Sequence, residues 1–267
     1  MATSDAQLLK KALCLLRLIV ADQGASALSV IASAAGLPVS TAHRIVATLV
    51  DQGMLIRVVR GRYAVGPVAT ALASPRSLHA LMKLAAEPIL KQISRDTGHI
   101  AQLGVLEDGM VTYLIKSGDG SDKLFTREDM SLEAYCSALG KILLSHLPPR
   151  ELDEYLLAGP FVALTPNTST DPEDLRRELI LSRERGYSID NCEITTNLWC
   201  VAAPIFDLRG RVIAALSLSS NSDALLGDKR EQHIAALKQA CSAVSESLFS
   251  QSYPRGIPAL DASSLRG

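Results

Sequence analysis

The chain lacks the features that mark secreted, membrane-spanning and cysteine-rich zinc proteins. Its five cysteines form no C-x-x-C pair and are odd in number, which disfavours a disulfide framework. No apolar run approaches the roughly 18–20 residues that a membrane-spanning helix needs. The first apolar stretch, 12–21, is interrupted by Arg17 and preceded by Ser4 and Asp5, which does not fit a signal peptide. These absences favour a reduced, cytoplasmic protein that contacts no membrane.

A strong net charge is also missing, but the average conceals two unlike halves. The whole chain of 267 residues has a net charge of −1. Residues 1–75 hold seven basic and three acidic residues, a net charge of +4, whereas residues 76–267 hold 20 basic and 25 acidic residues, a net charge of −5. The length allows two domains, and the asymmetry predicts a basic first domain joined to an acidic second one.

Three helical segments are predicted in the first 52 residues. Apolar residues recur at three- and four-residue steps over 6–21. A short apolar stretch over 30–35 follows, with Ser29 as its expected cap and Gly36 as its end. After this tight turn a third helix is predicted over 39–52.

A hairpin is predicted directly after the third helix. Residues 55–65 alternate loosely around a turn at Arg60 and Gly61. Helix, short helix, tight turn, helix and hairpin, in that order, are typical of a winged helix-turn-helix.

The third predicted helix and the hairpin carry side chains suited to reading DNA. Arginine can bind guanine through two hydrogen bonds, and serine or threonine can reach a base or a phosphate. Arginines near a hairpin tip are placed to meet phosphates, which position a protein without reading sequence. A polar helix face alone is common, but together with the turn, the hairpin and the basic charge it favours DNA binding. The predicted DNA contacts are Ser40, Thr41, His43, Arg44, Thr48, Arg60 and Arg62, with Arg57 nearby.

The remainder predicts a mixed α+β domain. A small-residue linker leads into a long helix over 77–96, in which Pro88 should cause a bend or a break. Strands over 100–106 and 110–116 flank a hairpin turn at Glu107-Asp108-Gly109. The other predicted elements are helices at 137–147, 150–157, 171–185 and 229–250, and strands at 187–190, 199–206 and 212–219.

Polar groups gather on two of the predicted strands. Alternation along 212–219 places Ser217 and Ser219 at the end of an otherwise apolar face. Cys200 lies on a face of small residues in 199–206, where it leaves room for a ligand.

Two further groups fit a ligand pocket. Ser137 begins a helix whose first amides, about 138–140, predict a seat for an anion or carboxylate, and Asp190 could accept a hydrogen bond from a ligand hydroxyl. Each of these residues also has a plainer interpretation, because a buried cysteine usually packs and a serine often caps a helix. The residues alone leave both interpretations open.

Several segments nevertheless occur in a familiar order. They are Cys136-Ser-Ala-Leu-Gly-Lys141, Thr165 to Asp171, Arg185-Gly-Tyr-Ser-Ile-Asp190, Cys200-Val-Ala-Ala-Pro-Ile-Phe-Asp207 and Ala214-Ala-Leu-Ser-Leu-Ser219. Together they resemble the effector domain of IclR-type transcriptional regulators. The segments Gly36-Leu-Pro-Val-Ser-Thr-Ala-His-Arg44 and Asp51-Gln-Gly53 resemble the winged helix of the same family, and the resemblance covers about 5–250.

The resemblance implies a homodimer or homotetramer bound to double-stranded, pseudopalindromic operator DNA. It also implies a GAF-like second domain that binds a small organic or aromatic acid. The positions that contact the effector in the family correspond to Ser137, Ala138, Asp190, Cys200, Ser217 and Ser219 in this chain.

The chain departs from the family pattern at three places. It has Glu133-Ala134-Tyr135 where Pro-Leu-His is usual, and Cys192-Glu193 with Asn197 where a Glu-Glu pair and a glycine are usual. The bulky Trp199 stands directly before Cys200. These departures predict a reshaped pocket wall and bear on the class of ligand.

The expected architecture is α+β. It comprises an N-terminal winged helix-turn-helix over 1–66, a partly helical linker over 67–80, a GAF-like α/β effector domain over 81–252 with a central, mostly antiparallel sheet, and a flexible tail over 253–267.

An enzyme is the main alternative to a regulator. Cys200 could be a nucleophile, but no motif places a histidine beside it. The pair Gly140-Lys141 is not a phosphate loop, because Tyr135 stands where the first glycine is needed. A redox switch through Cys200 is a third interpretation, although no basic group lies close in sequence to lower its pKa. We expect a protein that is not an enzyme and that has no cofactor and no metal site.

Overall fold

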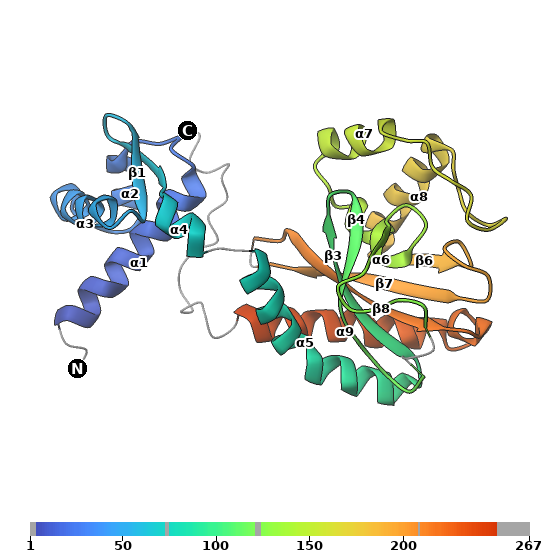
Figure 1. The fold of residues 1–267 in the computed structure, drawn as a ribbon. Helices are drawn as coiled ribbons and strands as arrows, with labels where there is room; N and C mark the ends of the chain where they lie inside the picture. Colours follow the sequence, from blue (N-terminus) through green and yellow to red (C-terminus); the bar gives the residue numbers. More distant parts are fainter. Residues whose placement is uncertain (1–3, 73–74, 121–123, 208, 250–267) are drawn as a thin grey trace. The chain divides into compact units, whose positions relative to one another are not determined.

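A computed structural model describes residues 4–72, 75–120, 124–207 and 209–249, which are coloured in Figure 1. The chain divides near residue 78 into two compact units. The elements of the first unit are α1 (Ser4–Asp22), α2 (Leu28–Ala34), α3 (Val39–Asp51), β1 (Leu55–Val59), β2 (Arg62–Val65) and α4 (Pro67–Leu72).

The first unit is a winged helix-turn-helix around one apolar core, which confirms the predicted order of elements. Leu15 and Ile19 of α1 meet Ile31 of α2, Val46 of α3 and Leu55 of β1, and each is at most 2% exposed. The antiparallel pair of β1 and β2 forms the wing.

The turn between α2 and α3 depends on a glycine. The chain bends by 108° between the two helices, an angle typical of the helix-turn-helix. Gly36 has φ +64°, its N–H donates to the carbonyl of Ser33, and the N–H of Leu37 donates to that of Ala32. The last carbonyls of α2 are thereby satisfied in a left-handed conformation that glycine adopts at little cost.

The predicted cap of α2 is wrong. Ser29 lies inside the helix, and the N-cap is Ala27, whose side chain has no acceptor. The amide of Leu28 instead donates to the carbonyl of Gly61, at 2.8 Å. A contact from the wing thus satisfies an end group that the sequence assigned to a local side chain.

The second unit contains a six-stranded sheet with every neighbouring pair antiparallel, in the order β5-β4-β3-β8-β7-β6. Most of α5 also belongs to this unit. The elements are α5 (Pro75–Thr97), β3 (Ile100–Glu107), β4 (Met110–Ser117), β5 (Ser131–Glu133), α6 (Ala138–Leu144), α7 (Pro149–Leu157), α8 (Pro172–Arg185), β6 (Ser188–Asn191), β7 (Trp199–Phe206), β8 (Val212–Ser220), the short 3-10 helix η2 (Asp223–Leu226) and α9 (Arg230–Phe249).

Two layers of helix cover the two faces of this sheet. Helices α5 and α9 lie on one face, and α6 lies on the other (Figure 1). Leu90 of α5 and Leu237 of α9 pack with Leu218 of β8, whereas Ile142 of α6 packs with Ala215, also of β8. Alternation along β8 therefore divides the apolar core into two layers.

The predicted fold class is confirmed, an α+β chain with an antiparallel sheet in its second part. The break expected at Pro88 is absent, because α5 continues through this residue. Proline has no N–H to donate to the carbonyl of Leu84, but Leu84 is 72% exposed, so water can satisfy that carbonyl. The sequence prediction missed β5 and η2, which are only three and four residues long. The tail predicted over 253–267 lies outside the described residues.

Candidate functional site

Helix α3 has one buried and one exposed face. Ala42, Ile45 and Val46 are buried against the helices before it. Thr41 is half-buried, and the hydroxyl of Thr48 donates to the carbonyl of Arg44 at 3.2 Å, so its proton is engaged within the helix. The predicted DNA contacts of α3 that are exposed are Ser40, His43, Arg44 and Thr48.

The wing carries exposed arginines on both strands and at its tip. Arg57 pairs with Tyr63 in the register of the hairpin, and Arg62 pairs with Val59. Arg60 precedes Gly61, whose φ of +79° closes the turn. All three arginines are exposed, so the wing adds positive charge to the unit that holds α3.

In the second unit, the pairing of strands brings the predicted ligand residues together. Asp190 of β6 pairs with Cys200 of β7, and Cys200 pairs with Ser219 of β8. Ser217 lies two residues from Ser219 and therefore on the same face. These four residues come from three strands and form one polar row on the α6 face of the sheet.

Hydrogen bonds extend this polar row to a fourth strand. Ser219 donates to the sulfur of Cys200 at 3.2 Å and accepts from the side-chain amide of Gln102 of β3 at 3.0 Å. Thr126 in turn donates to the side-chain oxygen of Gln102 at 3.0 Å. Gln102 and Thr126 are each 2% exposed. Our sequence analysis missed both, although a glutamine within an apolar strand could have pointed to Gln102.

Asp190 is fully buried and has one oxygen without a partner. Its Oδ1 accepts the N–H of Glu193 at 2.7 Å, and within the described part of the chain no donor meets Oδ2 with full hydrogen-bond geometry, although the Cys200 thiol and the Ile194 N–H also interact with this carboxyl group. Burial raises the pKa of Asp190 from 3.8 to about 7, the Glu193 carboxylate adds to the rise, and the Glu193 N–H and the Lys141 ammonium oppose it. A ligand hydroxyl that donates to Oδ2 would satisfy this acceptor.

A buried ion pair lies beside Asp190. Lys141 of α6 donates to Oε1 of Glu193 at 2.6 Å, and the two side chains are 3% and 13% exposed. The pair joins α6 to the segment after β6, so it holds two elements that contribute to the site. Glu193 thereby contacts both Lys141 and Asp190.

At the start of α6, where the sequence predicts a seat for a carboxylate, one of the three amides concerned is already engaged. The hydroxyl of Ser137 already accepts the amide of Gly140, at 3.0 Å. The backbone of Ala134 lies so close to Gly140 that a Cβ at this position would collide with its carbonyl oxygen, so only glycine fits here. Ala138 is tied to β6, because the hydroxyl of Ser188 donates to its carbonyl at 2.5 Å. Ser137 and Ala138 thus position α6 at the edge of the polar row.

The thiol of Cys200 is a poor nucleophile in this setting. Burial raises the pKa of Cys200 well above its ordinary value, and the carboxylate of Asp190 raises it further. Burial also raises the pKa of Cys136 to about 12. A thiolate is the reactive form, so both cysteines remain protonated at neutral pH and favour packing or hydrogen bonding over chemistry.

Trp199 does not line the polar row, contrary to the reshaped wall that its position predicted. Adjacent residues of a strand point to opposite faces, so Trp199 lies on the α9 face while Cys200 lies on the α6 face. Trp199 packs against the core of the α9 face and lines a pocket there.

The described residues contain no group of three or more histidine, cysteine or acidic side chains that could hold a metal ion. Among them, too, no single helix is long and apolar enough to cross a membrane. The bent pair α2 and α3 meets that criterion together, but only by length and composition.

Two families match separate parts of the chain. Residues 8–58 match the IclR helix-turn-helix domain, and residues 78–246 match the family described as bacterial transcriptional regulator IclR C-terminal. The HTH-type transcriptional regulator BhcR of Paracoccus denitrificans is 32% identical over 237 residues, which are 86% of this chain and 85% of that protein.

Solved structures show the same likeness. The Thermotoga maritima IclR is 32% identical with a TM-score of 0.60, and the match covers 91% of this chain and 98% of that one. An IclR homologue from Microbacterium hydrocarbonoxydans, complexed with 4-hydroxybenzoate, is 30% identical with a TM-score of 0.60, over 91% of this chain and 99% of that one.

Proposed function

The chain belongs to the IclR family of bacterial transcriptional regulators, and from this premise we propose that it binds operator DNA in response to a small organic or aromatic acid. Helix α3 reads bases and the wing holds phosphates. The acid binds on the α6 face of the sheet. The regulator acts in the cytoplasm as a homodimer or homotetramer on a pseudopalindromic operator, whose half-sites lie about one helical turn (~34 Å) or a multiple of it apart.

One observation carries the ligand-binding part of this proposal. Asp190 presents an unpaired, buried oxygen in the same row as Cys200 and Ser219. A buried acceptor without a donor costs about 1–3 kcal/mol, which a bound hydroxyl would recover. The homologue from Microbacterium hydrocarbonoxydans was solved with 4-hydroxybenzoate, an acid that carries such a hydroxyl. This supports a hydroxyl-bearing acid as the first compound to test.

The mechanism that we propose is a population shift. An acid enclosed in the second unit favours one of two states of the dimer, and the two states fit the paired half-sites differently. A ligand can shift this equilibrium only through a difference in its affinity for the two states. We expect this difference in affinity to arise at the buried residues around the polar row, because hydrogen bonds connect them to one another.

Replacing Arg44 by alanine should weaken operator binding by about 1–3 kcal/mol and relax specificity at one base pair, because Arg44 is the exposed arginine of α3. Fluorescence anisotropy on the DNA upstream of its own gene, with single base changes, measures both effects. Arg62→Ala, in the wing, should weaken binding to all sequences alike. Equal affinity of wild type and Arg44→Ala for every duplex would show that α3 is not the reading helix.

Replacing Cys200 by phenylalanine should remove the ligand response and leave DNA binding intact, because the larger ring fills the polar row. A thermal-shift screen of small carboxylates and aromatic acids, with 4-hydroxybenzoate first, identifies a ligand for the wild type. A ligand present at 100 times its Kd should raise the free energy of unfolding by about 2.7 kcal/mol. Cys200→Ser, of similar volume, should keep most of the response. Loss of both DNA and ligand binding in a folded Cys200→Phe protein would contradict a division into two modules.

We propose no catalytic activity for the chain. The high pKa of Cys200 counts against both a nucleophile and a redox switch at neutral pH. Turnover of a carboxylic acid that depends on Cys200 would overturn this part of the proposal.

A further inference from the structure

A pocket of about 950 Å³ lies on the α9 face of the sheet, away from the polar row. The pocket lies beside the end of β6 and the starts of β3, β7 and α9. Residues of η2 form one of its sides. Its volume is that of a small-molecule site. Its lining includes Ile189, Asn191, Trp199, Leu226, Arg230 and His233.

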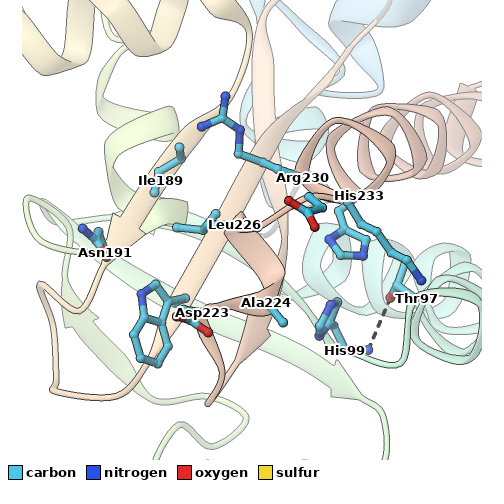
Figure 2. A pocket seen from close by; sticks show the side chains of 13 residues that line it. Thr97, His99, Ile189, Asn191, Asp223, Ala224, Leu226, Arg230 and His233 are labelled. Atoms are coloured by element: carbon cyan, nitrogen blue, oxygen red, sulfur yellow. Dashed lines mark hydrogen bonds between the residues drawn. The ribbon is translucent and has the colours of Figure 1, made fainter.

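The pocket offers an apolar surface for a flat ring. Trp199 is half-buried, and Ile189 and Leu226 are also partly buried along the same lining. Aromatic rings stack on an indole face or meet its edge, and such contacts stabilise a ligand beyond simple burial. In Figure 2, Ile189 and Leu226 lie between Asn191 at one end and the two histidines at the other.

Two histidine rings lie in contact at one end of the pocket, and the backbone holds one of them. Nδ1–H of His233 donates to the carbonyl of Leu225 at 3.0 Å, since a carbonyl only accepts. The ring of His99 meets that of His233 edge to face at 4.7 Å between centroids. The backbone N–H of His99 donates to the hydroxyl of Thr97, the dashed line in Figure 2. Burial and the neighbouring His233 lower the pKa of His99, which favours the neutral form of the His99 ring.

Two cations at the start of α9 are available to an anion. The side chain of Lys229 has no hydrogen-bond or ion-pair partner within the described residues. Arg230 has a single, long contact to Glu231, at 3.4 Å. The positive end of the α9 dipole adds to their attraction for a negative group.

Two acidic residues limit how much negative charge the pocket can accept. Asp223 and Asp228 also line it, so the two carboxylates balance the charges of Lys229 and Arg230. In the view of Figure 2, Asp223 lies on the side away from the guanidinium of Arg230. Asp228 directly precedes Lys229, so a polyphosphate would be repelled beside the two cations, whereas a single carboxylate meets less of this repulsion. These charges favour a monoanion.

The pocket and the polar row share the same two strands. Ile189 and Asn191 alternate with Asp190 along β6, and Trp199 directly precedes Cys200 in β7. We propose that this pocket is a second ligand site, for a small aromatic carboxylate, that lies back to back with the effector site across β6 and β7. This inference does not depend on DNA binding.

The chain contains a single tryptophan, and it lines this pocket, so its emission reports binding there directly. Titrating the full chain with benzoate, with excitation at the red edge of indole absorption, should give a saturable change. The double variant Lys229→Ala, Arg230→Ala should weaken that binding about tenfold or more. Arg150→Ala, which removes a cation that is 90% exposed on α7, is the matched control and should leave the curve unchanged.

Cys200→Phe separates the two sites. Because it fills the polar row and not the pocket, it should keep the tryptophan response to benzoate. A response that Cys200→Phe abolishes, or that survives unchanged in the double variant, would overturn the second site. So would the absence of any response at millimolar benzoate. If the emission changes with the concentration of the protein and not with that of benzoate, the pocket is an interface between copies of the chain. That result would also overturn the proposal.

Discussion

Replacing Lys141 by methionine should lower the free energy of unfolding by about 3–5 kcal/mol. Lys141 is 3% exposed and its ammonium lies 2.6 Å from Oε1 of Glu193, which is 13% exposed. Methionine has a similar length but no charge, so the variant leaves the Glu193 carboxylate buried without its partner. It also removes a positive charge that lowers the pKa of Asp190. The unpaired Glu193 carboxylate and the higher pKa of Asp190 both lower the free energy of unfolding at neutral pH.

Urea denaturation of the wild type and Lys141→Met measures this loss. Lys91→Met is a matched control, because Lys91 also lies 2.6 Å from a carboxylate, that of Glu87, but the two side chains are 54% and 47% exposed. The exposed pair should contribute no more than about 0.5 kcal/mol. The double variant Lys141→Met, Glu193→Gln should recover much of the loss, since no buried charge is then left alone. Equal losses for Lys141→Met and Lys91→Met would show that burial does not matter here.

Replacing Asp190 by asparagine should make the protein progressively more stable, relative to the wild type, as the pH rises from about 4 to about 8. The pKa of Asp190 is raised in the folded protein to about 7 from 3.8, so the unfolded chain releases the proton more readily. The stability that the protonated carboxyl contributes is present below pH 3.8, is lost between pH 3.8 and about 7, and does not change further above that. Three pKa units correspond to about 4 kcal/mol.

Denaturation curves at several pH values test this slope. The amide of asparagine keeps the acceptor for the N–H of Glu193, and its unpaired NH₂ costs a constant amount that does not affect the slope. Burial lowers the pKa of His99 and of His146, so the wild type and Asp190→Asn both lose stability as the pH falls below about 6.5. This loss is the same in the two proteins and therefore cancels when their free energies of unfolding are subtracted. Asp153→Asn, at a carboxylate 54% exposed, is the control. A difference between Asp190→Asn and wild type that is independent of pH would contradict the buried, proton-binding carboxyl.

The first unit could be predicted almost completely from the sequence. Its signals are local: Gly36 must accept a positive φ in the turn, and Gly61 must do so at the wing tip. The apolar spacing of α3 determines which face is buried, so Arg44 and His43 are exposed as expected. The error at Ser29 came from the one end group that is satisfied by a distant segment, the carbonyl of Gly61.

The candidate ligand site was predicted only in part. Alternation along β8 correctly placed Ser217 and Ser219 on one face, but no local pattern could show that Gln102 of β3 would bond to Ser219 from 117 residues away. Nor could it show that the carbonyl of Ala134 lies directly over Gly140. These contacts depend on strand order and on how α6 packs, and both are tertiary.

The sequence by itself determined the two-part organisation, the basic winged helix and the residues that meet on the sheet, because period, glycine position and charge act within one segment. Only the tertiary structure decided what each polar group meets. It left Oδ2 of Asp190 unpaired and joined Lys141 to Glu193. The physical reason is burial: a side chain's pKa, its partner and its access to a ligand depend on neighbours that are distant in the chain.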